Sequence, residues 1–375
     1  MNDKFKVVTI IGTRPEIIRL SETIKACDQC FEHILVHTGQ NYDYELNQIF
    51  FEDLELRAPD YYLESAGVHL GETIGNVIAK SYKLLSELKP DAVLILGDTN
   101  SALAAISAKR LKIPVFHMEA GNRCWDWNVP EMVNRTIVDR IADVNLPYTE
   151  NSRRYLLSEG MDGKTIFVTG SPMHEVISKN IDKIFKSDIL NHLNVEKDKY
   201  IVVSAHREEN IDLDNNFIDL VESINAVAEK YQIPIIFSTH PRTMKTIKNQ
   251  SIVFHPLVKN IKPLGFHDYV KLQANAMVVL SDSGTLTEES SILQFPAVLI
   301  RTSTERPEGL DAGTILLGGI KQREIIAAIE TVRLLKDKPA AKLPLDYETC
   351  DVSTKVVRII QSYIPVVNLT TWLKK

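Results

Sequence analysis

The sequence predicts an α/β protein built from two doubly wound domains whose sheets face a cleft. Three observations lead to this fold class: the length, the alternation of apolar runs with helical patterns, and a Gly-Pro break near the middle. At 375 residues, the chain is too long for one ordinary hydrophobic core. Alternating strands and helices are typical of parallel sheets that helices cover on both faces. Ligands are therefore expected at the carboxyl ends of the strands, where open α/β sheets bind them.

In the first half of the chain, short runs rich in β-branched residues predict buried strands, and amphipathic segments between them predict helices. The strands are expected at residues 6–11, 33–38, 92–96, 115–118 and 166–168. The helices are expected from about Pro15 onward and at residues 73–88, 101–111, 131–142 and 152–157.

The second half repeats this alternation after a Gly-Ser-Pro segment at 170–172, which divides a first domain (1–170) from a second (171–355). Its strands are expected at residues 200–204, 235–238, 252–254, 277–280 and 298–300. Its helices are expected at residues 216–230, 266–274, 286–293 and 324–335, and residues 354–363 form a last helical stretch.

Charge and targeting signals exclude several classes of protein. The net charge is −6, whereas a non-specific binder of nucleic acid or anionic membrane needs a basic excess. The apolar segment 5–11 stops at Gly12 without a cleavage site, so we expect no secretory signal and no membrane span. Cys27 and Cys30 form one C-x-x-C with no second pair for zinc. These features predict a cytoplasmic protein without a metal, a nucleic-acid partner or a membrane partner.

Charged residues follow several predicted strands of the first half. Arg14 lies in a Gly-Thr-Arg-Pro-Glu loop (12–16) at a helix start, where free N–H groups favour an anion such as a phosphate. Asp98, Glu119 and Glu131 follow at strand ends or at a helix start. Taken singly, Arg14 could be a surface residue, Asp98 a helix cap and Glu131 a favourable charge at a helix terminus. Together, the three carboxylates predict an acid/base cluster.

The strand ends of the second half carry groups that suit a diphosphate. His206 is followed directly by Arg207, and His240 is followed after one residue by Arg242. Ser283, Gly284 and Thr285 open a helix whose N–H groups can hold phosphates, and carboxylates follow one turn later. The sequence contains no G-x-G-x-x-G and no G-x-x-x-x-G-K-[ST], which disfavours a nicotinamide cofactor and an ATP-type phosphate loop.

An ordered set of motifs resembles that of the non-hydrolysing UDP-N-acetylglucosamine 2-epimerases, from residue 12 to about residue 313. The motifs lie at residues 12–16, 97–99, 119–121, 130–135, 206–207, 282–284 and 305–308. The resemblance implies a GT-B-like pair of Rossmann-like domains, with residues 356–375 crossing back to the first domain. It also implies a UDP-sugar substrate, no cofactor and a homodimer.

The resemblance further implies roles for individual residues. Asp98, Glu119 and Glu131 are expected to be the catalytic carboxylates near the sugar, with His206 beside the diphosphate. Tyr269 is expected to stack on uracil and Glu289 to bind ribose. The full set expected to contact UDP and its phosphates is Arg14, His240, Tyr269, Ser283, Gly284, Thr285, Glu289 and Arg306.

The implied reaction needs such groups. C2 of an N-acetylhexosamine is not next to a carbonyl, so its hydrogen is too weakly acidic for simple removal and return. Expelling UDP from C1 while a base takes the C2 proton leaves a 2-acetamidoglycal. Protonation from the other face and re-addition of UDP then give the epimer, without a redox cofactor.

Some positions depart from the UDP-N-acetylglucosamine members. Arg19 stands for their usual lysine, Glu208 for a second arginine, and Asn41 begins a different segment. These features resemble the branch that makes UDP-N-acetyl-L-fucosamine for capsule or O-antigen from its C2 epimer, a UDP-6-deoxytalosamine sugar. The alternative is UDP-N-acetylglucosamine, giving the mannosamine epimer. Remoter alternatives are a GT-B glycosyltransferase, which needs an acceptor, and a non-catalytic sensor, which needs no acid/base cluster.

Overall fold

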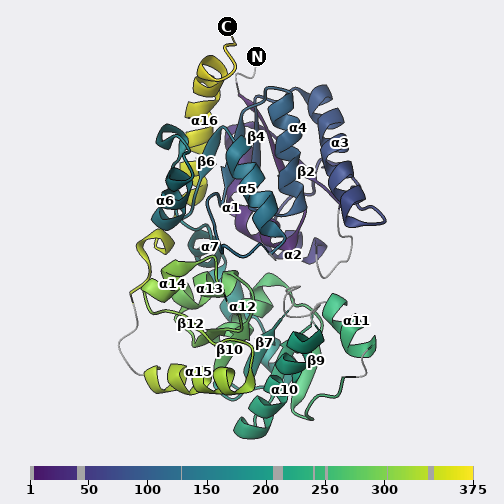
Figure 1. Ribbon diagram of the computed structural model, residues 1–375, viewed down its shortest axis with the longest axis vertical. Coiled ribbons are helices and arrows are strands. Elements are labelled where there is room, and N and C mark those ends of the chain that lie inside the picture. Colours follow the sequence, from purple (N-terminus) through teal and green to yellow (C-terminus); the bar gives the residue numbers. More distant parts are fainter. Residues whose placement is uncertain are drawn as a thin grey trace. The chain divides into compact units, whose positions relative to one another are not determined.

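The computed structural model describes residues 4–39, 47–127, 129–205, 214–239, 241–249, 252–301, 303–336 and 342–374 (Figure 1). The chain forms two compact units. Unit 1 is Met1–Ser178 with Glu348–Lys375, and unit 2 is Lys179–Tyr347. The boundary lies within helix α7 (Met173–Lys186), which follows the Gly-Ser-Pro segment. Each unit has a parallel sheet flanked by helices, so the predicted α/β class with two doubly wound domains is confirmed.

Unit 1 is built on one six-stranded parallel sheet. Its strands are β1 (Lys6–Ile11), β2 (Glu32–His37), β3 (Tyr61–Tyr62), β4 (Ala92–Leu96), β5 (Val115–Met118) and β6 (Val144–Leu146). Their order across the sheet is β3-β2-β1-β4-β5-β6. From β1 the chain adds strands toward one side of the sheet, and from β4 it adds them toward the other, so the topological switch point lies between β1 and β4. Open α/β sheets bind ligands at the carboxyl ends of the strands beside this point, where the loops after β1 and β4 begin.

Helices pack on the sheet of unit 1. They are α1 (Arg14–Cys30), α2 (Gln48–Asp53), α3 (Leu70–Leu88), η2 (Asn100–Leu103), α4 (Ala104–Arg110), α5 (Glu131–Ile141), α6 (Glu150–Ser158), η3 (Gly163–Thr165) and α16 (Val352–Thr370). The helices α3, α4 and α5 cover one face, where Val77, Ala105 and Val138 join Val8 and Val93 of the sheet in one core. The helix α1 packs against β1 and β2, and α16 packs against α1.

Unit 2 repeats this strand order. Its strands are β7 (Ile201–Ser204), β8 (Ile235–Ser238), β9 (Val258–Ile261), β10 (Val278–Ser281), β11 (Ala297–Leu299) and β12 (Leu316–Leu317). Across the sheet they run β12-β11-β10-β7-β8-β9, which is the order of unit 1 when the strands of each unit are counted in sequence. The switch point of unit 2 therefore lies between β7 and β10.

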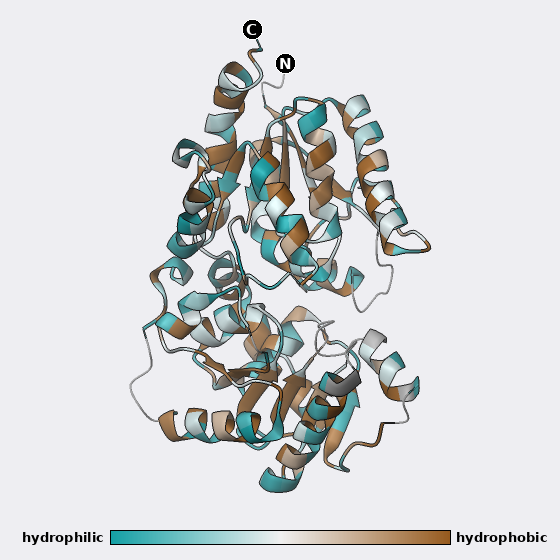
Figure 2. Ribbon diagram, in the orientation of Figure 1, coloured by the Kyte–Doolittle hydropathy of each residue, from teal (hydrophilic) through white to brown (hydrophobic). Residues whose placement is uncertain are grey.

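Two cores sandwich the sheet of unit 2. Its helices are α8 (Ile189–Leu193), α10 (Asp214–Tyr231), α11 (Pro241–Asn249), α12 (Phe266–Ala274), α13 (Thr285–Leu293), α14 (Pro307–Asp311), α15 (Gln322–Leu335) and η4 (Leu345–Tyr347). Ile201 and Val203 of β7 pack with α10 and α15, whereas Val202 packs with α12 and α13. This alternation matches a strand that is buried on both faces, and Figure 2 shows the strands of this sheet as mostly hydrophobic.

Two of the predicted strands are wrong, and both predictions concern sheet edges. Residues 252–254 pack into a small core with α10 and α11, while the edge strand is β9, whose two middle residues are exposed. Residues 166–168 make only one bridge, from Ile166 to Asn145, and β6 is the strand. Neither edge strand has an apolar run that locates it: the middle residues of β9 are polar and exposed, and β6 has three residues around the polar Asn145.

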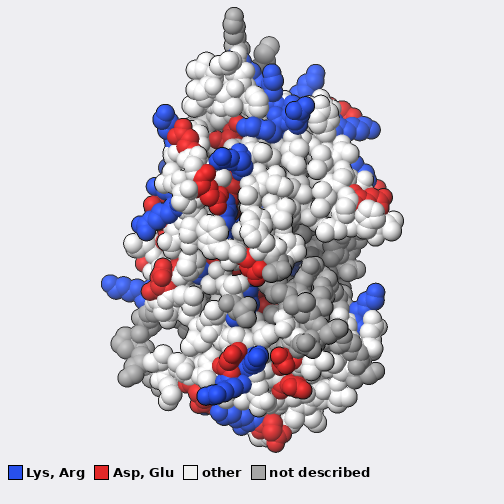
Figure 3. Space-filling view, viewed as in Figure 1, with Lys and Arg blue, Asp and Glu red and all other residues white. Residues whose placement is uncertain are grey.

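The surface carries charges of both signs. On the face drawn in Figure 3, basic and acidic side chains are interspersed and leave broad uncharged areas between them. Among the described helices, none is both long and apolar enough to cross a membrane.

Candidate active site

The first turn of α1, directly after β1, holds two charged residues in different environments. Pro15 stands in the first turn of α1, where a residue without an N–H is tolerated. The guanidinium of Arg14 lies 5.9 Å from the centre of the Phe50 ring, and the residue is partly exposed. Glu16, by contrast, is only 1% exposed. Arg14 can therefore meet a ligand, whereas Glu16 acts inside the protein.

The Glu16 carboxylate connects the start of α1 and the preceding loop to η2, the short helix that follows β4. It accepts hydrogen bonds from the N–H of Gly12 (3.1 Å) and from the hydroxyls of Thr13 (2.7 Å) and Ser101. The Thr99 hydroxyl lies 2.5 Å from that of Ser101. Burial raises the pKa of Glu16 from 4.5 to about 7, because the hydrogen bonds that lower it only partly offset desolvation.

This raised pKa predicts a specific pH dependence of stability. Between pH 4.5 and about 7, folded Glu16 keeps a proton that the unfolded chain releases. The stabilisation from this group is therefore complete below pH 4.5 and is lost as the pH rises through 7, by about 3 kcal/mol in total. Glu16→Gln should remove that loss. Urea unfolding of both proteins from pH 4.5 to 8 measures it, and parallel curves for the two proteins would contradict the prediction.

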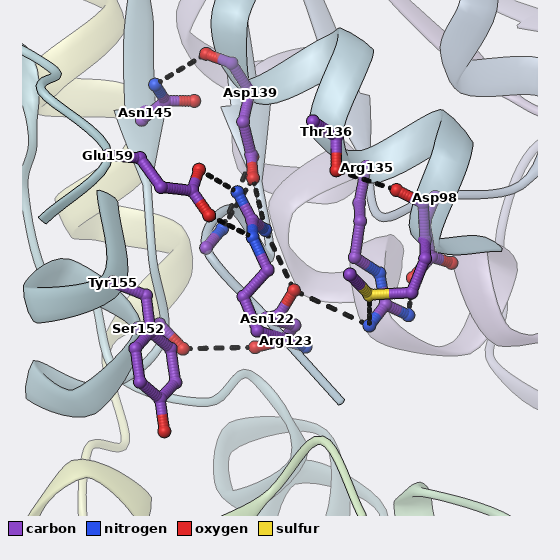
Figure 4. A network of polar contacts seen from close by, with 12 residues as sticks. Asp98, Asn122, Arg123, Arg135, Thr136, Asp139, Asn145, Ser152, Tyr155 and Glu159 are labelled. Atoms are coloured by element: carbon purple, nitrogen blue, oxygen red, sulfur yellow. Dashed lines mark hydrogen bonds and ion pairs between the residues drawn. The ribbon is translucent and has the colours of Figure 1, made fainter. Parts of the chain in front are cut away.

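The loop after β4 places Asp98 beside Arg135 of α5. The Asp98 carboxylate accepts a hydrogen bond from Nη2 of Arg135 (Figure 4). Asn134 donates to the backbone carbonyl of Asp98 at 2.9 Å. The Arg135 side chain is 5% exposed and that of Asp98 is 19% exposed. Two residues of one helix therefore orient Asp98, whose carboxylate keeps some surface for a ligand.

Glu119, directly after β5, has an unusual backbone. Its φ of 62° lies in the left-handed region, which is unfavourable for a non-glycine residue. Its carboxylate accepts hydrogen bonds from Nη1 of Arg19 at 2.8 Å and from Nδ2 of Asn122 at 3.1 Å. The Arg19 guanidinium also lies 5.6 Å from the centre of the Tyr148 ring. Backbone strain that is held in place by surrounding structure is typical of functional sites.

Asp98 and Glu119 come together because β4 and β5 are neighbouring strands. Leu96 pairs with Met118 in the parallel register, so both acidic residues follow the carboxyl ends of their strands on the same side of the sheet. A Cβ added to Gly97 would lie 3.8 Å from the Glu119 carboxylate.

Glu131, the third predicted carboxylate, is half-buried and is the first residue of α5. Arg135 follows one turn later on the same helix and pairs with Asp98. Arg14 and the three predicted carboxylates of unit 1 therefore lie at the start of α1, in the loops after β4 and β5, and at the start of α5.

In unit 2, α13 begins at the end of β10. The hydroxyl of Ser283 lies 2.8 Å from that of Thr285, and the N–H of Ser283 donates to the Ser281 hydroxyl at 3.1 Å. Gly284 is the N-cap, and a Cβ added there would lie 2.6 Å from Oε1 of Glu305. A side chain at 284 would therefore require the Glu305 carboxylate, which pairs with Arg301, to move.

Buried ion pairs surround the start of α13. Arg301 donates to Glu305 at 2.7 Å, and both side chains are almost fully buried. Nη1 of Arg306 lies 3.4 Å from the carboxylate of Glu288, which is completely buried. Removing one partner of such a pair leaves an uncompensated buried charge, so these residues hold one another in place.

The predicted nucleotide-binding residues of unit 2 lie on neighbouring helices where the structure describes them. Glu289 of α13 accepts a hydrogen bond from Gln273 of α12 at 2.9 Å. Tyr269 of α12 is partly buried against the core that α12 and α13 share. His206 and His240 lie outside the described residues.

Sequence reasoning missed the partners of these acidic residues. It noted Arg135 as a motif residue without connecting it to Asp98, and it did not identify Gln273. The only signal for Arg135 is its helical spacing of one turn from Glu131. Gln273 has no comparable signal.

Comparison with known proteins identifies the family. The family described as UDP-N-acetylglucosamine 2-epimerase matches residues 25–361. The chain is 37% identical to the UDP-N-acetylglucosamine 2-epimerase of Methanocaldococcus jannaschii over 336 residues, which is 87% of this chain and 91% of that protein.

Two solved structures are similar over nearly their whole length. The UDP-N-acetylglucosamine 2-epimerase of Rickettsia bellii has a TM-score of 0.91 and 46% identity, covering 99% of this chain and 100% of that one. The Methanocaldococcus jannaschii enzyme in complex with UDP-GlcNAc and UDP has a TM-score of 0.89 and 35% identity, covering 95% and 99%. Given this agreement of sequence and structure, the chain belongs to the UDP-N-acetylglucosamine 2-epimerase family of isomerases.

Proposed function

We propose that this protein inverts C2 of a UDP-linked N-acetylhexosamine by eliminating UDP from C1 and adding it back. One observation carries the proposal most directly. Asp98 and Glu119 follow the carboxyl ends of two neighbouring strands, and an arginine binds each carboxylate. Two carboxylates fixed at the carboxyl ends of neighbouring strands suit the removal of a proton from one face of C2 and its return to the other face.

The proposed first step breaks two bonds. A carboxylate takes the C2 proton, the C2–H electrons form the C1=C2 double bond, and the C1–O bond breaks so that its electrons leave with UDP. The second step reverses this sequence, with protonation on the opposite face of C2. Arg19 and Arg135 orient the carboxylates, and Glu131 is the third acid/base candidate.

The groups proposed for UDP lie mostly on unit 2. The hydroxyls of Ser283 and Thr285 and the N–H groups at the start of α13 suit a diphosphate, because a helix N-terminus favours negative charge. Tyr269 and Glu289, on adjacent helices, suit the uracil ring and the ribose hydroxyls. The remaining proposed phosphate contacts are Arg14, His206, His240, Gly284 and Arg306.

We propose UDP-N-acetyl-L-fucosamine and its C2 epimer as the sugar pair, and UDP-N-acetylglucosamine as the alternative substrate. The support is the departure at Arg19, whose guanidinium contacts the Glu119 carboxylate directly. Asn41 and Glu208, the other departures, lie outside the described residues. The proposed homodimer can be tested by sedimentation of the purified protein.

Proton NMR in heavy water tests the reaction and the sugar together. The protein is incubated separately with UDP-N-acetylglucosamine and with UDP-2-acetamido-2,6-dideoxy-L-talose. We expect deuterium at C2 of both epimers, with faster exchange for the 6-deoxy sugar. Inversion with retention of the original hydrogen, a requirement for a nicotinamide, or accumulation of free sugar would each overturn the mechanism. Faster exchange with UDP-N-acetylglucosamine would overturn only the choice of sugar.

A further inference from the structure

Asp139 of α5 is a buried carboxylate that no step of the proposed reaction uses. It is 1% exposed, and its contacts reach the two acidic loops of unit 1, which are the loop after β4 with Asp98 and the loop after β5 with Glu119. One of its oxygens is 3.0 Å from Nδ1 of His117, a fully buried residue of β5. Nε2 of His117 lies 2.8 Å from the carbonyl oxygen of Gly97. Since a carbonyl can only accept, this nitrogen carries a hydrogen, and Asp139 thereby holds the residue directly before Asp98.

The same carboxylate also holds the loop that follows Glu119. The N–H of Gly121 donates to both Asp139 oxygens, at 3.2 and 3.1 Å. Gly121 has a φ of 82°, so the chain turns sharply at this residue, two positions after Glu119. Asn122, the next residue, donates to the Glu119 carboxylate itself at 3.1 Å.

Arg123 completes the network. Its Nη1 donates to Asp139 at 2.7 Å, and its Nε and Nη2 donate to the two oxygens of Glu159 at 2.7 Å each (Figure 4). Burial alone would raise the pKa of Asp139, but the neighbouring His117 ring and the Arg123 guanidinium bring it below its ordinary value. A charge with several donors in a buried site has one favourable arrangement, which makes the network rigid.

We infer that Asp139, acting through His117 and Gly121, is a positioning residue that sets the spacing between Asp98 and Glu119. This inference rests on the proposed function, because the spacing matters only if the two carboxylates act on one sugar. Neither Asp139 nor His117 touches the reacting atoms. A displacement of about 1 Å in a reacting group can lower a rate roughly 100-fold, so the effect falls on turnover.

Asp143, which lies between α5 and β6, provides a matched control that also contacts β5. Its side chain is also buried, and it accepts hydrogen bonds from Nζ of Lys109 at 2.6 Å and from the N–H of Val115 at 2.9 Å. Val115 is the first residue of β5, at the opposite end from Glu119. Asp143→Asn therefore removes a buried charge that contacts the first residue of β5, away from the loops that hold Asp98 and Glu119.

The experiment compares Asp139→Asn, Asp143→Asn and the parent protein by thermal unfolding, amide hydrogen exchange and steady-state kinetics. We expect similar losses of melting temperature in the two variants. Amide exchange at residues 97–99 and 119–123 should rise only in Asp139→Asn. Its kcat should fall roughly 100-fold with little change in KM, while kcat of Asp143→Asn stays within about threefold.

A second variant guards against misfolding of Asp139→Asn. His117→Phe keeps a ring in the core but removes both ring nitrogens, and it should raise exchange at residues 97–99 and lower kcat. The double variant should be little worse than the poorer single one, because the two residues act as a unit.

The outcomes separate this inference from the proposed function. Unchanged exchange at both loops, or an equal loss of kcat in Asp139→Asn and Asp143→Asn, overturns the positioning role. If the parent protein exchanges no C2 hydrogen, the proposed function fails by itself, and amide exchange still decides whether Asp139 orders the two loops.

Discussion

Replacing Glu119 with glutamine is expected to lower kcat about 1,000-fold while UDP affinity stays nearly unchanged. The amide has the shape of the carboxylate but cannot take or return the C2 proton. The change also leaves the Arg19 guanidinium without its ionic partner at 2.8 Å. UDP affinity should survive, because the proposed diphosphate contacts of α13 belong to unit 2. Deuterium incorporation at C2 and calorimetric titration with UDP measure the two quantities.

Glu64→Gln is the matched control for this substitution. Glu64 also belongs to unit 1 and has a left-handed backbone, with a φ of 50°, but it is exposed and lies outside the acidic cluster. Its replacement should leave kcat unchanged. A Glu119→Gln variant with near-normal deuterium incorporation would remove Glu119 from the acid/base set.

Gly121→Ala is expected to destabilise unit 1 by about 3 kcal/mol or more, because two costs combine. The φ of 82° is unfavourable for alanine. In addition, the new Cβ would meet the backbone carbonyl of Ser152 and would lie 2.9 Å from Cγ of Leu156. The backbone of a helix cannot yield as the end of a flexible side chain can, so the loop after Glu119 must move.

Gly160→Ala separates the two costs of that substitution. Gly160 has a similar φ of 78°, but a Cβ added there meets nothing within 4 Å. Its loss should be about 1 kcal/mol, from the backbone alone. The three tryptophans, Trp125, Trp127 and Trp372, all belong to unit 1, so tryptophan fluorescence during urea unfolding reports on this unit. Equal losses in the two variants would show that the contact with Ser152 is relieved at little cost.

The sequence predicts the central strands of both sheets well and the edges poorly. Strands β1, β4 and β5 are buried on both faces, so their apolar runs predict them directly. The edge strands β3 and β12 have only two residues each, and β9 has a polar, exposed middle. The edge strand β6 is buried, but it has only three residues with Asn145 in the middle, which is too short a run to show an apolar pattern.

The candidate site shows the same division. The positions of Asp98 and Glu119 could be predicted, since residues directly after neighbouring parallel strands all lie at the carboxyl end of the sheet. The pairing of Asp98 with Arg135, 37 residues away, depends on how α5 packs and leaves no local pattern. Glu16 lies in a recognisable loop, yet its burial, and so its raised pKa, follows from contacts with residues some 85 positions further on.

The return of α16 to α1 has a consequence for biosynthesis. Unit 2 is one continuous stretch of chain, whereas unit 1 needs α16, which is synthesised only after unit 2. The whole of unit 2 therefore emerges from the ribosome before α16 has been synthesised. Domains usually fold in the order in which they emerge, but unit 1 cannot be completed first. Until α16 is synthesised, the surface of unit 1 that buries Val356, Ile360 and Ile364 of α16 stays exposed to solvent. Chains that stall before this helix are expected to be aggregation-prone and to need chaperones.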